Sequence, residues 1–381
     1  MASPRILTRE FILCFFAQFT ISSVLCLLIP TLPIYFSRFG AKESEIGVLI
    51  GAFNVTALVV RPFVGKALSR VSGKNFMLGG ALLYAAASVG YLLVPPLWPH
   101  LFVRILHGVG LGLFSTASFT LVSNLSSEKH RAETISYFYL SINLAMAFAP
   151  YFGMILINRF SFTILFLACL CLSLCALSLV VNLEGHNGDS SEIQSPGHLS
   201  FLTREMIDIA MMAFMVNIIW GTVIVFFPLH ALNHGVENPG IFFAVYAFVT
   251  ILGRSLGGRI PDIYGRTKVI FPCLIVLIVS MILLSISTNL KMFILVAIIW
   301  GAGMSLLYPT LIAYAVDRAG SHRGQALGTF TALADLGAGI GPVIMGVVLE
   351  NAGYPAMFLC LALISVIGLL YFYLFVRKMP K

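Results

Sequence analysis

Charged side chains are scarce in this chain. They make up 10% of the 381 residues, whereas an ordinary soluble domain carries about 25%. Hydrophobic residues make up 59%, which is more than the core of a soluble protein can bury. A bilayer accommodates them, because a spanning helix needs about 20 mostly apolar residues and satisfies its backbone hydrogen bonds internally. The composition therefore excludes a soluble protein and predicts about a dozen membrane spans.

Several functional signatures are also missing. The Lys and Arg residues stand singly between apolar runs, so the net charge of +8 does not indicate a nucleic-acid partner. All seven cysteines lie in apolar segments, so we expect no disulfide, no metal site and no cofactor. The chain has no Gly-x4-Gly-Lys-Ser/Thr loop for ATP. A membrane-embedded transferase is one alternative, but it would need a catalytic His-x4-Asp or Asp-x-x-Asp cluster at one face. None is found, so we do not expect an enzyme.

Apolar windows along the chain predict twelve membrane-spanning helices. We expect them over 11–36, 46–68, 76–95, 98–122, 134–157, 161–183, 206–231, 240–260, 269–288, 292–315, 324–350 and 354–376. One long polar stretch, rich in glycine and serine, has the composition of a linker. We therefore predict an all-α integral membrane protein with an N-terminal six-helix bundle over 1–183, a cytoplasmic linker over 184–205 and a C-terminal six-helix bundle over 206–381.

The basic residues predict the orientation of these spans. If the N-terminus is cytoplasmic, most loop Lys and Arg residues fall inside, and only Arg38, Lys42, Arg159 and Lys291 fall in outside loops. Basic loops favour the cytoplasmic side of a membrane. We therefore expect a multi-pass protein of the cell (inner) membrane with both termini in the cytoplasm.

The two halves repeat each other at a nearly constant offset. Segments 61–66 and 101–110 are similar to 254–259 and 294–303, each 193 residues further on. His130 and Arg131 match His322 and Arg323 at an offset of 192. Parallel repeats of this kind are a known transporter architecture, with the binding site at the repeat interface near the middle of the membrane. The two predicted bundles are therefore expected to be pseudo-symmetric.

Segments 65–74 and 258–266 each combine glycines with basic residues. They resemble the Gly-x-x-x-Asp-Arg-x-Gly-Arg-Arg-like loop of the major facilitator superfamily, in its branch of bacterial drug:proton antiporters. The first copy has Ser69 in place of the aspartate, and the second keeps Asp262 but has Ile263 in place of the arginine. The likeness spans nearly the whole chain and implies the twelve-helix major facilitator fold. It implies a conformational latch formed by Arg61, Gly65, Arg70, Arg254, Gly258, Arg259, Asp262, Gly265 and Arg266.

The latch has a physical interpretation. Its glycines would permit tight turns between spans, and its acid could lie against the N-terminus of a neighbouring helix, where negative charge is favourable. By pseudo-symmetry, we hypothesise that Asp262 meets the start of the span at 134–157, near Arg131, and stabilises one state of the transport cycle. The alternative is that these charges only set the topology.

The resemblance also implies a function: proton-coupled efflux of a small amphiphilic or organic solute by alternating access. The expected partners are the small-molecule solute, protons and the lipid bilayer, and the protein is expected to be a monomer. A proton-coupled importer of a metabolite is the alternative, because the glycine-rich element typical of antiporters is degraded at 145–153. Its richer version is at 337–346.

Asp335 is the first candidate for proton coupling. It lies about 11 residues into the expected helix 324–350, which is about 16 Å deep at about 1.5 Å per residue. A carboxylate at that depth faces a cavity or a partner and is common in proton relays. Asn143, its counterpart in the first half, is also polar and deep. Asp335 could instead be a hydrogen-bonded packing residue.

Arg104 and His107 are the other proton-coupling candidates, on the motif Arg-x-x-His-Gly-x-Gly in the span 98–122. This motif resembles the family's Arg-x-x-Gln-Gly-x-Gly element. Arg104 could pair with substrate or tune a neighbour's proton affinity, or it could extend to the outer interface. His107 could titrate near neutral pH or serve in helix packing.

The family also implies that the first, fourth, seventh and tenth spans line a substrate cavity. Aromatic and amide side chains on such spans suit an amphiphilic or aromatic solute, although each could be a packing residue. With the deep amide of the fifth span, the candidates are Gln18, Asn143, Asn217, Trp220, Trp300 and Tyr308.

Overall fold

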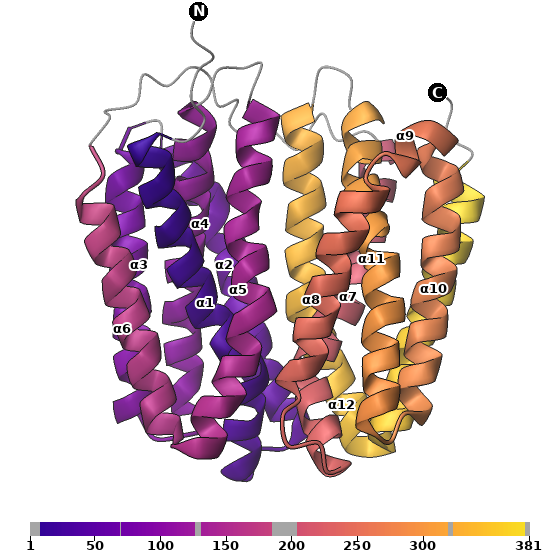
Figure 1. Cartoon of the computed structure of the whole chain (residues 1–381), viewed down its shortest axis with the longest axis horizontal. Coiled ribbons are helices and arrows are strands. Elements are labelled where there is room, and N and C mark those ends of the chain that lie inside the picture. Colours follow the sequence, from indigo (N-terminus) through magenta and orange to yellow (C-terminus); the bar gives the residue numbers. More distant parts are fainter. Residues whose placement is uncertain (1–7, 69, 126–130, 185–203, 319–322, 378–381) are drawn as a thin grey trace, which may run out of the picture. The chain divides into compact units, whose positions relative to one another are not determined.

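The computed structural model describes residues 8–68, 70–125, 131–184, 204–318 and 323–377, and these residues form helices and short connections (Figure 1). The helices are α1 (Arg9–Arg38), α2 (Glu43–Ala67), α3 (Gly73–Leu93), α4 (Pro99–Asn124), α5 (Arg131–Arg159), α6 (Phe162–Val181), α7 (Arg204–Asn233), α8 (Gly240–Gly257), α9 (Ile260–Tyr264), α10 (Arg266–Ile286), α11 (Leu290–Arg318), α12 (Arg323–Tyr371) and the short η2 (Phe372–Val376). Most of the predicted linker lies outside the described residues.

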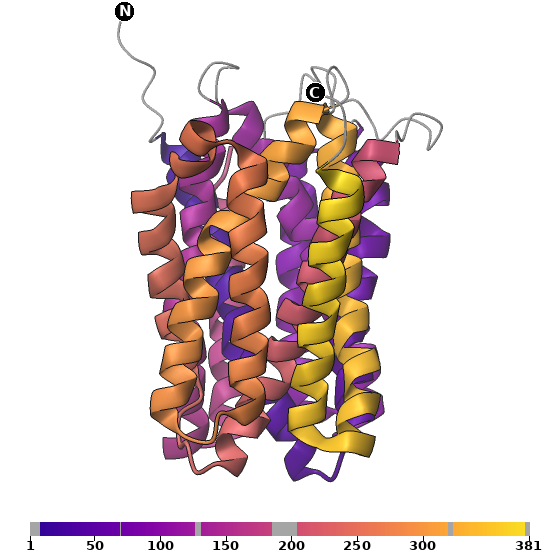
Figure 2. The ribbon, with the colours of Figure 1, turned by 90° about the vertical axis from the view of Figure 1, so that its right-hand side faces the viewer.

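Eleven of the described helices are long and apolar enough to cross a membrane. The last of them, α12, is interrupted at Gly353, whose φ of 80° and ψ of 173° are not helical. Glycine adopts this left-handed φ without a steric penalty. The chain reverses its direction at this kink (Figure 2), so α12 supplies two spans. The predicted all-α membrane fold with twelve spans is therefore confirmed.

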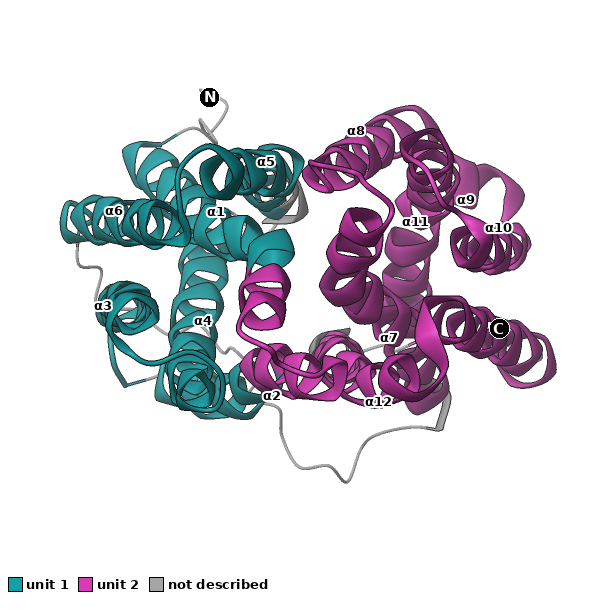
Figure 3. Ribbon diagram, turned by 90° about the horizontal axis from the view of Figure 1, so that it is seen from below, with its two compact units in different colours: residues 1–31, 55–195 teal, residues 32–54, 196–381 magenta. Residues whose placement is uncertain are grey.

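Contacts divide the chain into two compact units (Figure 3). Unit 1 comprises Met1–Thr31 and Val55–Ser195, and unit 2 comprises Leu32–Asn54 and Pro196–Lys381. The end of α1 and the first half of α2 thus group with the C-terminal helices, although they lie in the predicted N-terminal bundle. The domain limits expected from the sequence remain a prediction.

In unit 1, α3 packs against both α4 and α6. The crossing of α3 and α4 is close because small residues meet there. A Cβ added at Gly80 would lie 2.8 Å from the carbonyl oxygen of Gly110. Small residues bring membrane helices together in this way because lipid provides no hydrophobic drive between them.

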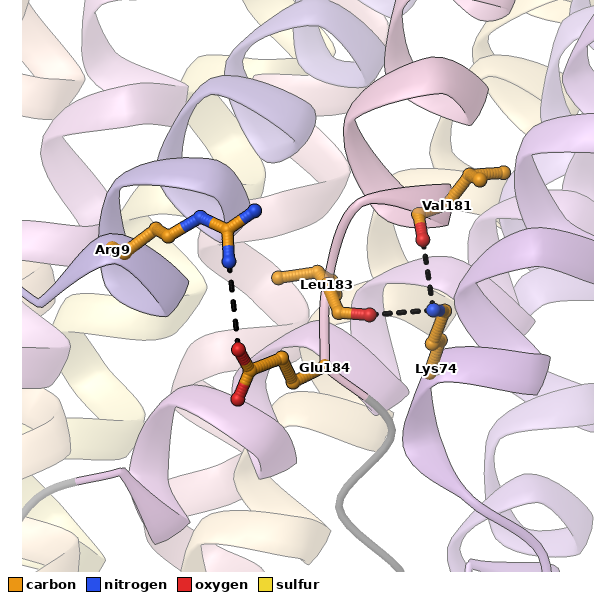
Figure 4. Close-up of polar contacts among 5 residues, drawn as sticks. All are labelled: Arg9, Lys74, Val181, Leu183 and Glu184. Carbon is orange, nitrogen blue, oxygen red and sulfur yellow. Dashed lines mark hydrogen bonds and ion pairs between the residues drawn. The ribbon is translucent and has the colours of Figure 1, made fainter.

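One end of unit 1 is held by contacts at the start of the predicted linker (Figure 4). The Lys74 ammonium, at the start of α3, donates to the carbonyl oxygens of Val181 at 2.8 Å and Leu183 at 2.5 Å. Arg9 forms an exposed ion pair with Glu184 at 3.5 Å. The carbonyls at the end of a helix have no intrahelical partner, so Lys74 caps α6.

In unit 2, α7 packs along α12, and α10 packs between α11 and α12. Glycines of α12 allow the backbones of α7 and α12 to approach each other closely. A Cβ added at Gly337 would lie 2.3 Å from the carbonyl oxygen of Phe214, and one at Gly341 would lie 2.7 Å from that of Ile218. The glycine run at 337–346 is therefore a helix-packing element in this structure.

Candidate functional site

A polar network fills the space between α3 and α4 in unit 1. The Arg104 guanidinium donates to the Tyr91 hydroxyl at 3.4 Å, and the same hydroxyl lies 3.2 Å from His107 Nδ1. The ring of Tyr84 meets the ring of His107 edge-on at 4.2 Å. Arg104 is 2% exposed, so its guanidinium does not reach the outer interface. The structure thus brings the predicted pair Arg104 and His107 together through Tyr91.

His100 completes this network and was not predicted. Its ring stacks on Tyr91 at 5.6 Å, and its Nδ1 lies 2.8 Å from the Pro95 carbonyl oxygen. Phe166 of α6 also stacks on Tyr91, at 5.3 Å. The sequence spacing could have indicated His100, because His100 and His107 are seven residues apart on α4, as Tyr84 and Tyr91 are on α3. Residues spaced by seven lie on one helix face.

Gln18 is buried in unit 1 with its amide satisfied. Its Oε1 accepts from the Ser118 hydroxyl at 2.8 Å, and its Nε2 donates to the Ser22 hydroxyl at 3.0 Å. Gln18 therefore joins α1 to α4. Asn143 is half-buried on α5.

An aromatic group in unit 2 gathers two of the predicted cavity residues. The Tyr246 and Trp300 rings lie 4.5 Å apart, and the Trp220 indole is within hydrogen-bonding reach of Tyr246. The Trp300 indole N–H is buried and has no hydrogen-bond partner among the described residues. Asn217, one turn before Trp220 on α7, donates to the Ala213 carbonyl oxygen at 2.8 Å. Aromatic faces with free polar groups can bind an aromatic or cationic solute.

Tyr246 of α8 was missed by the sequence reasoning, because only four spans were expected to line the cavity. Tyr308, which was predicted, lies elsewhere on α11, with its ring 5.6 Å from that of Phe330.

A glycine-lined seam joins the first half of α2 to α12. A Cβ added at Gly47 would lie 2.2 Å from the carbonyl oxygen of Pro342, and one at Gly51 would lie 2.3 Å from that of Gly339. Further along, a Cβ at Gly346 would lie 2.6 Å from a backbone oxygen of α2. We call this contact the α2–α12 seam. At these glycines the backbones of the two helices approach so closely that an added Cβ would clash.

An ion pair closes one end of the α2–α12 seam. The Lys42 ammonium lies 3.4 Å from Glu350, and Glu350 also accepts hydrogen bonds from Ser44 at the start of α2. A carboxylate at a helix N-terminus is favourable because the first amide groups have no intrahelical partner.

Asp335 lies near the other end of the seam. It is half-buried on α12, one turn before Gly339 and on the same helix face. The pairings of Gly51 with Gly339 and of Gly47 with Pro342 set an antiparallel register. Continued by one turn, this register places Asp335 level with Asn54 of α2. Asn54 was not predicted, although it too is a polar residue in the middle of a span.

The structure corrects the expected turns of the latch. Gly65 lies inside α2, so the expectation of a tight turn there is wrong. Gly258 lies in the short turn between α8 and α9, but its φ of −57° and ψ of −26° are helical, so the turn does not depend on the conformational freedom of glycine. Gly265, with φ 91°, does form the expected turn, between α9 and α10. In the first half α2 ends at Ala67, within one residue of the expected end at 68.

The charged residues of the latch have different surroundings. Arg266 pairs with Asp317 of α11 at 2.5 Å, a partner that was not predicted. Arg61 and Arg254 are half-buried on α2 and α8, whereas Arg70, Arg259 and Asp262 are exposed. The side chain of Arg131 lies outside the described residues, so its hypothesised contact with Asp262 stays a prediction.

Neither a metal site nor a disulfide is seen in the part of the chain that the structure describes. No three His, Cys, Asp or Glu side chains there come together as a metal site. The seven cysteines are all free thiols.

Comparison with known proteins finds relatives that align with 90% of this chain. The family model described as Major Facilitator Superfamily matches residues 11–237 and 209–381. The staphylopine export protein of Staphylococcus aureus is 25% identical over 90% of both chains, and multidrug resistance protein 2 of Bacillus subtilis is 23% identical over the same shares. The quinolone resistance protein NorA of Staphylococcus aureus is 21% identical, over 90% of this chain and 91% of its own.

Solved structures share the fold. The nucleoside transporter NupG aligns with a TM-score of 0.83 at 13% identity, over 98% of this chain and 100% of its own. A D-xylose-proton symporter aligns with a TM-score of 0.77 at 14% identity, over 97% of both chains.

Proposed function

The chain belongs to the major facilitator superfamily, whose members are transporters and not enzymes, and from this premise we propose that it exports a small amphiphilic or organic solute in exchange for protons. Its spans and its family make it a multi-pass membrane transporter of small molecules. The direction, the proton coupling and the solute class are the proposal.

The observation that carries the proposal is the position of Asp335. Among the described residues, the other carboxylates lie in connections or within a few residues of a helix end, whereas Asp335 lies in the middle of a span. A charge at that depth is costly to maintain, which favours the protonated carboxyl group, and intramembrane carboxyl groups of this kind serve in proton relays. We assign the coupling proton to Asp335, with Arg104 and His107 as the proposed partners in proton coupling.

The proposed solute class follows from unit 2. The half-buried Trp220 offers an aromatic ring, with the buried Trp300 behind Tyr246 and the Asn217 amide within one turn of Trp220. Such groups bind flat, amphiphilic molecules, with cations favoured over aromatic faces. Gln18, Asn143 and Tyr308 remain proposed cavity residues.

Export is favoured by the names of the relatives. They are named for staphylopine export, multidrug resistance and quinolone resistance, and each aligns with nearly the whole chain. The basic loops support a cell (inner) membrane protein with cytoplasmic termini, and we propose that it works as a monomer.

The test uses the purified protein in proteoliposomes with an imposed pH gradient and radiolabelled ethidium or a quinolone as the solute. Exchange against protons predicts that an acidic interior drives uptake, and that Asp335→Asn abolishes this accumulation while solute-for-solute exchange persists. Uptake driven only by an acidic exterior would favour the importer alternative. Full gradient-driven accumulation by Asp335→Asn would remove this residue from the coupling role.

A further inference from the structure

Polar and aromatic side chains of unit 2 meet around the Tyr246 hydroxyl of α8. This hydroxyl is within hydrogen-bonding reach of Thr250, one turn along α8, and of Trp220 on α7. The Tyr246 ring lies 4.5 Å from the Trp300 ring of α11. Arg254, one turn beyond Thr250, is near enough to the hydroxyl to interact with it electrostatically. Three helices of one unit therefore bring an arginine, two hydroxyls and two indoles together.

Tyr246, Thr250 and Arg254 form one face of α8, because a spacing of four residues returns to the same side of a helix. A rise of about 1.5 Å per residue places the Arg254 Cα about 12 Å beyond that of Tyr246. Helical side chains lean toward the N-terminus, so the Arg254 side chain extends back toward the hydroxyl. Close packing on α11 fixes this helix, since a Cβ added at Gly253 would lie 2.3 Å from the Ser305 hydroxyl oxygen.

Arg254 has no acidic partner in the part of the chain that the structure describes. No described carboxylate forms an ion pair with it, whereas Arg266 of α10 pairs with Asp317. Arg254 is half-buried, and its Nε is buried without a hydrogen-bond partner among the described residues. An arginine that only set the topology would keep its guanidinium in water. A guanidinium has five donors and no acceptor, so this group lacks an anion.

The corresponding face in the first half has the arginine but not the hydroxyls. At the offset of 193, Arg254 corresponds to Arg61, whereas Tyr246 and Thr250 correspond to Phe53 and Ala57. Phe53 and Ala57 are each 2% exposed, so a phenyl ring and a methyl group suffice for packing there. A buried hydroxyl costs free energy unless it is hydrogen-bonded. The hydroxyls beside Arg254 therefore indicate a role in binding.

We propose that Arg254 binds a carboxylate group of the exported solute, with the Trp220 ring against the aromatic part of that solute. The solute class, which rests on the proposed export function, is thereby narrowed to aromatic acids and zwitterions. A guanidinium pairs bidentately with a carboxylate and supplies the single positive charge that a monoanion needs. Arg254 and Trp220 are both half-buried and so open to a solute, and Tyr246 contacts both.

The test compares a quinolone, which carries a carboxylate, with its methyl ester, which keeps the ring and loses the charge. Affinities are measured on the purified protein in detergent by isothermal titration calorimetry. The wild type is expected to bind the acid about tenfold more tightly than the ester, because hydrogen bonds to charged groups are the stronger ones. This comparison requires no variant, so it does not depend on the folding of a substituted protein.

Three variants assign the preference for the acid to one side chain. Arg254→Gln is expected to bind acid and ester equally, with the affinity that the wild type has for the ester. Arg254→Lys keeps the charge but not the fork of donors, so its preference is expected to be intermediate. The matched control Arg318→Gln removes a half-buried arginine from the last turn of α11 in the same unit. It is expected to leave the preference unchanged.

Equal affinity of the wild type for acid and ester would overturn the proposal. So would an undiminished preference in Arg254→Gln, which would assign carboxylate recognition to another residue. Ethidium has no carboxylate and tests the proposed export separately. Proton-driven ethidium transport with equal affinities for acid and ester would overturn the carboxylate site and leave the proposed function intact. A preference for the acid without any proton-driven transport would support the site and overturn the proposed function.

Discussion

The Tyr91 hydroxyl connects the polar residues of unit 1, since it contacts both Arg104 and His107. All three side chains are at least 98% buried. In such surroundings a hydrogen-bonding group that loses its partner costs about 1–3 kcal/mol. The Tyr91 hydroxyl is therefore expected to contribute to the stability of this network.

Tyr91→Phe is expected to destabilise the protein by about 1–3 kcal/mol, because it leaves Arg104 and His107 without that oxygen. The measurement is the thermal unfolding midpoint in detergent. Tyr151→Phe, at an exposed position of α5, is the matched control and should leave the midpoint unchanged. Equal midpoints for Tyr91→Phe and wild type would show that the network does not stabilise the fold.

Sequence reasoning identified Arg104 and His107 because a charge and an imidazole are unusual inside a span. It missed Tyr84 and Tyr91, because tyrosine is common in membrane helices and its partner lies on another helix. It missed Asp317 for a related reason, since the pairing of Arg266 depends on how α10 meets α11. Contacts between helices are set by tertiary packing, which a single sequence does not display.

Helix α2 offers a direct comparison of glycines within one element. Gly47 and Gly51 lie at the α2–α12 seam, against backbone oxygens of α12, whereas a Cβ at Gly65 would meet nothing within 4 Å. The three positions share a helical backbone and differ in their surroundings. Their substitution therefore separates packing from helix propensity.

Gly51→Ala is expected to destabilise the protein by about 1–3 kcal/mol, because α2 and α12 must separate to admit the methyl group. Gly47→Ala should act in the same direction. Gly65→Ala is the control on the same helix and should be neutral or stabilising by up to about 1 kcal/mol, since alanine favours the helix. Thermal unfolding of the three variants measures this, and a Gly51→Ala variant as stable as Gly65→Ala would contradict the seam.

The spans themselves were largely predictable. The expected helices 98–122 and 324–350 correspond to α4 and to the part of α12 before the Gly353 kink, since long apolar runs between charges specify membrane helices. The short helix α9 was not expected, because its five residues include no apolar run long enough to span. The grouping of residues 32–54 with unit 2 depends on the α2–α12 seam and was not visible in the sequence order.

Helices α1 and α2 each run through both units, because the division falls at residues 31–32 and 54–55. Pro30 and Pro33 flank the first of these points, and prolines bend helices. Asn54 stands at the second, level with Asp335 in the seam's register. Any movement of one unit against the other must therefore bend α1 and α2 at these points, and it leaves the seam, which lies within unit 2, closed.

Exchange of a solute for a proton is tested most directly by proton release on binding. Purified protein in weakly buffered detergent is mixed with ethidium while a pH indicator is followed, and binding is measured in parallel. Wild-type protein is predicted to release protons as ethidium binds, and Asp335→Asn to bind it with no release. Saturable binding to the wild type without any proton release would contradict proton-coupled exchange.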